Sequence, residues 1–137
     1  MPIEGPVEAA SELEGLQVDS QRRLILVIAE DSSVLGAYRR ILRGEEYQLV
    51  GLYDEGDAVR RARYLRPWAI LMDYDVGKVG WRALESLRSW RATRHCPVVV
   101  CCAAGAGARA MSMGASAHLA KPVSVSELRE VLSRIER

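Results

Sequence analysis

The apolar run at residues 68–72, which Asp73 follows at once, constrains the fold of this chain more than any other stretch. A continuous apolar run of this length is typical of a strand that is buried on both faces of a parallel sheet. An ionised Asp is rarely buried, so we expect Asp73 where this strand leaves the sheet. Ligands of open parallel sheets bind outside the carboxyl ends of the strands. The sequence therefore predicts that Asp73 lies where such a fold carries out its chemistry.

Four more segments have the composition of buried strands, and segments with helical periodicity separate them. The predicted strands are residues 24–29, 47–53, 68–72, 98–102 and 117–120, and the predicted helices lie near 34–42, 58–65, 84–90, 109–113 and 125–135. This alternation predicts an α/β fold with a parallel sheet, right-handed crossovers and helices on both faces. Among five-stranded doubly wound sheets we expect the flavodoxin-like order 2-1-3-4-5, which puts strands 1 and 3 side by side.

Side chains with useful chemistry follow the predicted strands at one common edge. Glu30 and Asp31 follow the first strand, Asp73 follows the third, Cys102 ends the fourth and Lys121 follows the fifth. Three carboxylates within about 5 Å of one another repel by roughly 3 kcal/mol per pair at an effective dielectric constant near 20. Such a cluster therefore takes up protons or a cation.

Oxygen ligands without His or Cys are the donor set that suits Mg²⁺. A metal beside a free carboxylate oxygen, with an ammonium group opposite, forms a site for a transferring phosphoryl group. The other interpretation of these residues is that each acid caps a helix or faces water.

Charge is distributed unevenly along the chain. Residues 1–20 hold five acidic residues and no Lys or Arg, and the 137-residue chain has a net charge of +1, so residues 21–137 carry +6. We interpret residues 1–22 as a loose acidic segment and residues 23–137 as one domain. The basic excess is spread over several predicted helices, so we expect no direct nucleic-acid binding.

Three cysteines, Cys96, Cys101 and Cys102, lie within seven residues. Their spacing fits neither a disulfide framework nor a zinc site, which favours small buried hydrophobic side chains. Free cysteines are typical of a reducing compartment. No apolar run approaches the length of a membrane span, and the first residues lack the pattern of a signal peptide. We therefore expect a cytoplasmic protein without a membrane segment.

Residues 114–122, which read Gly-Ala-Ser-Ala-His-Leu-Ala-Lys-Pro, carry the most specific likeness to a known family. From about Leu24 to Arg137 the chain resembles the receiver domains of two-component response regulators. That family has an acidic pair after strand 1, a phospho-acceptor Asp after strand 3, a Ser or Thr after strand 4 and a Lys-Pro, usually joined in cis, after strand 5. Here those positions read Glu30-Asp31, Asp73, Cys102 and Lys121-Pro122.

The resemblance implies a phosphorelay protein whose Asp73 accepts a phosphoryl group, with Lys121 paired to its carboxylate. It further implies that Mg²⁺ is the cofactor, and its ligands would be Glu30, Asp31, Asp73 and the backbone carbonyl of Asp75. A sensor histidine kinase or a phosphotransfer protein is the expected donor, and a downstream protein is the expected output partner. The resemblance leaves homodimer formation open. A receiver of this kind is a signalling module and not an enzyme.

The chain departs from the family at the residues that respond to phosphorylation. Cys102 replaces the hydroxyl residue, and His118 stands where the family usually has Tyr or Phe. Val76-Gly77 replaces a Met-Pro, Gly80 comes one residue early, and the segment between Cys102 and Lys121 is about three residues short. We therefore expect a shortened fourth helix and a switch, built on Cys102 and His118, that moves less than in a typical receiver.

Two other interpretations stay open. A pseudo-receiver would use the same fold as a docking surface without phosphorylation, which the altered Cys102 and His118 favour and the retained acidic residues oppose. The stretch Asp73-Tyr74-Asp75-Val76 also resembles the Asp-x-Asp opening of haloacid-dehalogenase phosphatases. That family usually carries this motif on its first strand, and it needs further acidic and Lys motifs downstream.

Overall fold

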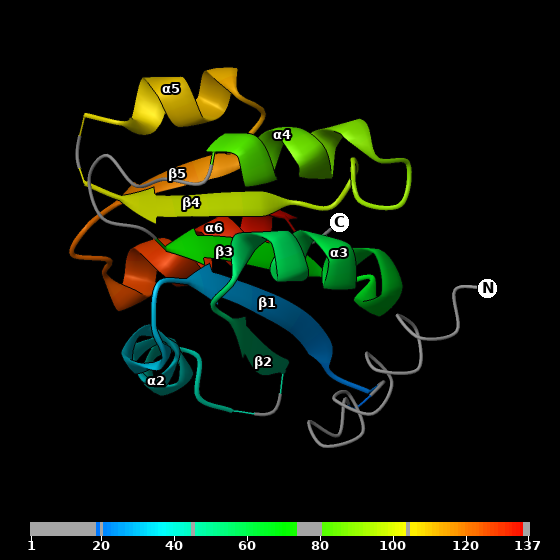
Figure 1. Cartoon of the computed structure of the whole chain (residues 1–137). Helices are drawn as coiled ribbons and strands as arrows, with labels where there is room; N and C mark the ends of the chain where they lie inside the picture. Colours follow the sequence, from blue (N-terminus) through cyan, green and yellow to red (C-terminus); the bar gives the residue numbers. More distant parts are fainter. Residues whose placement is uncertain (1–18, 20, 45, 74–80, 104, 136–137) are drawn as a thin grey trace.

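A computed structural model describes residues 19, 21–44, 46–73, 81–103 and 105–135. Five strands alternate with helices along the chain (Figure 1). The strands are β1 (Arg23–Ala29), β2 (Tyr47–Leu52), β3 (Ala69–Asp73), β4 (Val98–Cys102) and β5 (Ala117–Ala120). The helices are α2 (Ser32–Ile41), α3 (Glu55–Leu65), α4 (Trp81–Ser89), α5 (Gly107–Ser112) and α6 (Val125–Ile135). The predicted alternation of strands and helices is confirmed.

All five strands lie parallel in one sheet with the order β2-β1-β3-β4-β5, as predicted. In the register of the sheet, Ala29 lies opposite Asp73 and Asp73 lies opposite Cys101. Cys102 lies opposite Ala120, one residue before Lys121. The residues that end or follow β1, β3, β4 and β5 therefore meet at the carboxyl edge of the sheet.

Two apolar layers enclose the sheet. Helices α3, α4 and α5 cover one face, and α2 and α6 cover the other (Figure 1). Along β3, Ile70 and Met72 belong to the α3–α4 layer and Leu71 belongs to the α2–α6 layer. Because side chains alternate along a strand, Asp73 points toward the α2–α6 side.

Several boundaries differ from the sequence predictions by one to three residues. Strand β3 runs from Ala69 to Asp73 instead of over residues 68–72, so Asp73 is the last residue of the strand and not the first residue after it. The Asp73 side chain is buried, with 6% of the residue exposed, although we expected an exposed carboxylate. Its partners, described below, explain this burial. Strand β2 ends at Leu52, helix α4 begins at Trp81, and the short helix α5 begins at Gly107 instead of Arg109.

The predicted acidic segment falls largely outside the described residues. Of residues 1–22, only Asp19, Gln21 and Arg22 are described, so the boundary of this segment stays a prediction. Within the described parts of the chain, no helix has the length and apolar character needed to cross a membrane.

Three helices begin with a side chain that accepts a hydrogen bond from a backbone N–H group of the first turn. Asp31 caps α2 by accepting from the N–H of Ser33 at 2.9 Å, and Asp54 caps α3 by accepting from the N–H of Asp57 at 2.8 Å. The Ser124 hydroxyl caps α6 by accepting from the N–H of Glu127 at 3.0 Å. These bonds satisfy N–H groups that have no partner within the helix.

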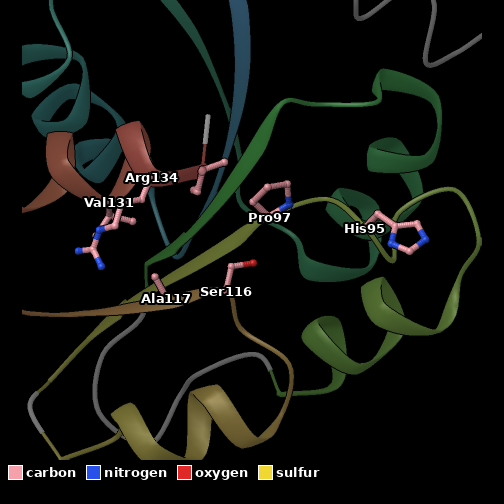
Figure 2. Close-up of a pocket in the computed structure, with 7 residues that line it drawn as sticks. His95, Pro97, Ser116, Ala117, Val131 and Arg134 are labelled. Atoms are coloured by element: carbon pink, nitrogen blue, oxygen red, sulfur yellow. The ribbon is translucent and has the colours of Figure 1, made fainter. Parts of the chain in front are cut away.

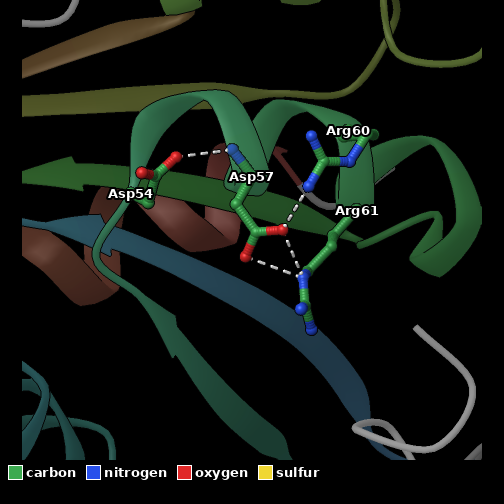
Figure 3. A network of polar contacts seen from close by, with 4 residues as sticks. All are labelled: Asp54, Asp57, Arg60 and Arg61. Carbon is green, nitrogen blue, oxygen red and sulfur yellow. Dashed lines mark hydrogen bonds and ion pairs between the residues drawn. The ribbon is translucent and has the colours of Figure 1, made fainter. Parts of the chain in front are cut away.

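The first turn of α3 also carries a small ionic network (Figure 3). The Asp57 carboxylate lies 2.8 Å from a guanidinium nitrogen of Arg60 and 2.8 Å from one of Arg61. Pairs three and four residues apart, with the acid nearer the helix N-terminus, contribute a few tenths of a kcal/mol each on a helix surface. The network therefore supports the start of α3 without forming part of the carboxyl edge.

Arg88 connects α4 by hydrogen bonds to the segments that lead into β4 and β5. Its Nε donates to the carbonyl of Gly114 at 2.7 Å, and its Nη1 donates to the carbonyls of Cys96 at 2.7 Å and Arg94 at 3.1 Å. Its Nη2 donates to the hydroxyl of Ser116 at 3.2 Å. One guanidinium thus satisfies acceptors from two loops, which fixes the entry of both strands.

We predict that Arg88→Ala lowers the free energy of unfolding by about 2 kcal/mol, because three backbone carbonyls lose a charged donor. Urea unfolding followed by circular dichroism measures this change. Arg91→Ala, at an exposed arginine three residues later, is the matched control and should leave the midpoint nearly unchanged. Equal midpoints for the Arg88 variant and the unmodified protein would contradict the assignment.

Candidate functional site

Five of the sequence-predicted site residues lie at the carboxyl edge of the sheet. Glu30 and Asp31 follow β1, Asp73 ends β3, Cys102 ends β4, and Lys121 follows β5. The strand order places β1, β3 and β4 side by side at the centre of this edge, with β5 beside β4. The fold thus brings these residues to one end of the molecule, as the sequence predicted.

Asp73 lies at the centre of the site, and each of its carboxylate oxygens has a partner. Oδ1 lies 2.5 Å from the Nζ of Lys121, and Oδ2 accepts a hydrogen bond from the hydroxyl of Tyr38 at 2.5 Å. A buried carboxylate is costly unless it is paired and hydrogen-bonded. The ammonium group and the hydroxyl together explain why this Asp is buried inside the sheet edge.

Tyr38 is the site residue that the sequence interpretation missed. Its ring extends from α2 into the α2–α6 layer, with 3% of the residue exposed. Burial, followed by the nearby Cys101 and Asp73, raises the pKa of the Tyr38 hydroxyl, so it stays a protonated donor. A buried Tyr usually needs an acceptor for its hydroxyl. That requirement was the signal available in the sequence.

The predicted acidic pair has a different arrangement from the one we expected. Glu30 and Asp31 are exposed, and the Asp31 carboxylate accepts hydrogen bonds from both the backbone and the hydroxyl of Ser33. These bonds from Ser33 lower the pKa of Asp31. Within the described parts of the chain, no three Asp, Glu, His or Cys side chains gather closely enough to hold a metal ion. The tight three-carboxylate cluster is therefore absent, because Asp31 turns to Ser33 while Asp73 turns to Lys121 and Tyr38.

Asp75, the remaining predicted metal ligand, lies outside the described residues, as does the whole segment 74–80. Its carbonyl is therefore a prediction only. The same holds for Val76, Gly77 and Gly80, at which the sequence departs from the family pattern.

Cys102 and His118 contact each other across β4 and β5. Cys102 is fully buried, and its Sγ lies 3.5 Å from Nε2 of the half-buried His118. His118 lies against the backbone of Gly107, where an added Cβ would come within 2.7 Å of Nδ1. The imidazole thus occupies space that only glycine at position 107 leaves open, and it points inward toward the thiol.

The cysteines are free thiols, as the sequence predicted. Burial raises the pKa of Cys101 to about 12 and that of Cys96 to about 11. Burial also raises the pKa of Cys102, against the lowering effect of Lys121. All three therefore stay protonated at neutral pH and pack as small apolar groups.

Lys121 and Pro122 are joined by a cis peptide bond, as the resemblance implied.

A cavity of about 360 Å³ lies at the opposite end of β4 and β5 (Figure 2). Its lining residues are His95, Pro97, Ser116, Ala117, Val131, Arg134 and Ile135. His95 is exposed. Trp81 and Trp90 pack against the α3–α4 layer, beneath the guanidinium groups of Arg109 and Arg63.

Known proteins share both the sequence pattern and the fold. The sequence model of the response regulator receiver domain matches residues 25–133. None of the curated proteins matches the chain. A response regulator of Chloroflexus aurantiacus J-10-fl has 24% identity and a TM-score of 0.74, over 83% of this chain and 97% of that one.

Two further solved structures extend the likeness. The receiver domain of sensor histidine kinase PA1611 from Pseudomonas aeruginosa PAO1, solved with a magnesium ion in its active site cleft, has 29% identity and a TM-score of 0.72, over 85% of this chain and 99% of that one. The chemotaxis response regulator CheY4 of Vibrio cholerae shares the fold, with 18% identity and a TM-score of 0.70, over 83% of this chain and 98% of that one. With the match over residues 25–133, the chain belongs to the family of response regulator receiver domains of two-component systems.

Proposed function

We propose that this receiver domain accepts a phosphoryl group on Asp73 and signals through contacts with other proteins. The observation that carries the proposal is the ion pair between Asp73 and Lys121, 2.5 Å apart at the carboxyl edge of the sheet. A carboxylate at this position is a nucleophile, and a nearby ammonium group compensates the charge of a phosphoryl group. Family membership supports the same assignment.

In the proposed reaction, a carboxylate oxygen of Asp73 attacks the phosphorus of a phosphohistidine or an acyl phosphate. A new P–O bond forms, the bond from phosphorus to the donor breaks, and the leaving group departs with that electron pair. Lys121 holds the carboxylate before transfer, and its three N–H donors allow it to face a phosphoryl oxygen afterward. Arg could not replace Lys121 well, because the planar guanidinium group of Arg differs in shape from the compact ammonium group of Lys.

Mg²⁺ is the proposed cofactor, with Asp31 as the main carboxylate ligand and Glu30, Asp73 and the carbonyl of Asp75 as the others. The donor set fits this cation, because all of these ligands are oxygens and Asp31 lies two residues beyond Ala29, which pairs with Asp73. Binding requires the Asp31 carboxylate to share its oxygens between Ser33 and the metal. The bound ion would neutralise the charge of the transferring phosphoryl group.

The proposed partners follow from the chemistry and from the family. A sensor histidine kinase or a phosphotransfer protein would donate the phosphoryl group, and a downstream protein would read the phosphorylated state. The proposed location is the cytoplasm, which agrees with three free thiols. Homodimer formation is compatible with these roles.

A pseudo-receiver is the second candidate, and one observation favours it. His118 already contacts Cys102 in this structure, so the residues that usually respond to phosphorylation are engaged with each other. An Asp-x-Asp phosphatase is less well supported, because Asp73 ends the third strand and the chain belongs to a signalling family. Repeated turnover of a phosphate ester would identify a phosphatase, whereas a receiver takes up one phosphoryl group.

Asp73→Asn should abolish labelling by acetyl phosphate in the presence of Mg²⁺, because the amide lacks the anionic oxygen that attacks phosphorus. Intact mass spectrometry measures the addition of one phosphoryl group to the unmodified protein. Asp54→Asn, at the cap of α3, is the matched control and should label normally. Equal labelling of the Asp73 variant would exclude Asp73 as the acceptor.

Mg²⁺ should raise the melting temperature, because it binds the native site and not the unfolded chain. At a concentration ten times Kd the stabilisation is about 1.4 kcal/mol, which corresponds to roughly 5 °C. Asp31→Asn should remove most of this rise while keeping the helix cap, since Asn also caps helices well. Asp57→Asn on α3 should keep the full rise, and a full rise in the Asp31 variant would contradict the ligand assignment.

Phosphorylation should move this receiver less than a typical one. A thiol is a weak donor, so Cys102 cannot supply the charge-assisted hydrogen bond, about 1.5–3 kcal/mol, that a hydroxyl gives to a phosphoryl group. Amide hydrogen exchange over residues 102–121, with and without beryllofluoride and Mg²⁺, measures the response. We expect a small change in protection, and Cys102→Thr should enlarge it. A large change in the unmodified protein would contradict a weak switch.

A further inference from the structure

We propose that Tyr38 restrains the phospho-acceptor: its hydroxyl holds Oδ2 of Asp73 in the resting state and thereby slows phosphoryl transfer. This inference rests on the proposed role of Asp73. It adds a residue of α2 to a site that the sequence pattern builds from strand ends alone. The distance of 2.5 Å between the two oxygens is typical of a strong, charge-assisted O–H···O⁻ hydrogen bond.

Both carboxylate oxygens of Asp73 already have a donor in the resting state. Lys121 lies on Oδ1 and Tyr38 lies on Oδ2, while only 6% of Asp73 is exposed. A hydrogen bond to an anionic oxygen stabilises the anion, and attack on phosphorus removes negative charge from that oxygen. The bond is therefore stronger in the ground state than in the transition state, which raises the barrier.

The two donors differ in how they can respond during the reaction. The Lys121 side chain is about one-third exposed and its ammonium group carries three N–H donors, so it can turn toward the phosphoryl oxygens as charge moves there. Tyr38 has one O–H donor on a ring that is 97% buried in the α2–α6 layer. The neighbouring group on that side is the Cys101 thiol, whose sulfur is a weak acceptor. Tyr38 therefore loses a strong bond on transfer and gains only a weak one.

The transfer step itself stays balanced under this restraint. The ionised Asp73 supplies the electron pair for the new P–O bond, and a small acyl phosphate donor releases acetate with the pair of the broken P–O bond. Tyr38 keeps its proton throughout and takes no part in covalent chemistry. Its effect is on the rate constant of transfer and not on the amount of phosphoryl group bound at the end.

Tyr38→Phe tests this inference, because it removes the hydroxyl and keeps the buried ring. The measurement is the rate constant of labelling by acetyl phosphate, taken by intact mass at Mg²⁺ concentrations that saturate each protein. We expect the variant to label about tenfold faster, the rate equivalent of one charge-assisted hydrogen bond lost in the ground state only. The maximum extent of labelling should be unchanged.

Tyr47→Phe is the matched control. Tyr47 is buried in the same apolar layer, but it begins β2 at the opposite edge of the sheet. Its substitution reports any general effect of losing a buried tyrosine hydroxyl, and it should leave the labelling rate unchanged. Thermal melting of both variants separates a change in rate from a change in stability.

The outcomes separate this inference from the proposed function. Equal or slower labelling of Tyr38→Phe, relative to an unmodified protein that does label, overturns the restraint and leaves Asp73 as the acceptor. Equal acceleration by Tyr47→Phe also overturns it, because the effect would then be general. Labelling of neither the unmodified protein nor the Tyr38 variant refutes the proposed function, and the restraint with it.

Discussion

The buried carboxylate of Asp73 imposes the constraint on which the rest of the carboxyl edge depends. A buried anion without a partner costs several kcal/mol, so β3 can end in Asp73 only if other elements bring donors to it. Lys121 comes from the residue after β5, and Tyr38 comes from α2. One carboxylate therefore links a central strand, an edge strand and a helix that lie far apart in the sequence. Any shift of β5 that withdrew Lys121 would leave the anion under-compensated.

The sheet explains why these partners meet. In a parallel sheet all carboxyl ends lie at one edge, and short runs of apolar residues locate each end in the sequence. Asp73, Cys102 and Lys121 each stand at the end of such a run, so their proximity was predictable from the sequence. The alternation of strands and helices predicted a parallel doubly wound sheet, and the expected order 2-1-3-4-5 is one of the orders that such sheets adopt. The boundaries differ from the predicted ones by one to three residues, and the inclusion of Asp73 in β3 depends on partners that no local pattern encodes.

Other features of the site depend on distances between side chains of different elements, and the hydrophobic periodicity of the sequence does not determine these distances. Helical spacing indicates that Tyr38 faces the core, but whether its hydroxyl reaches Asp73 depends on how α2 lies across the sheet. Asp31 poses a different problem, because a carboxylate after a strand serves equally well as a helix cap or as a metal ligand. In this structure it caps α2 through Ser33, so the expected cluster of three carboxylates does not form. Both outcomes concern side-chain direction, which the sequence leaves open.

Under the proposed function, the acceptor side of the site (Asp73 and its partners) and the reporting side (Cys102 and His118) differ in what they retain. The acceptor side keeps its carboxylate and its ammonium group and adds a hydroxyl from α2. On the reporting side, His118 lies inward against Cys102, in the space that Gly107 leaves. A ligand shifts an equilibrium between two states only as far as its interactions with those states differ. Because the contact between His118 and Cys102 exists without a phosphoryl group, and because a thiol binds such a group weakly, the proposed phosphorylation would change the free energy of the His118 side chain little. Under the proposed function, output would therefore depend more on the charge that a phosphoryl group adds at Asp73 than on movement of the His118 side chain.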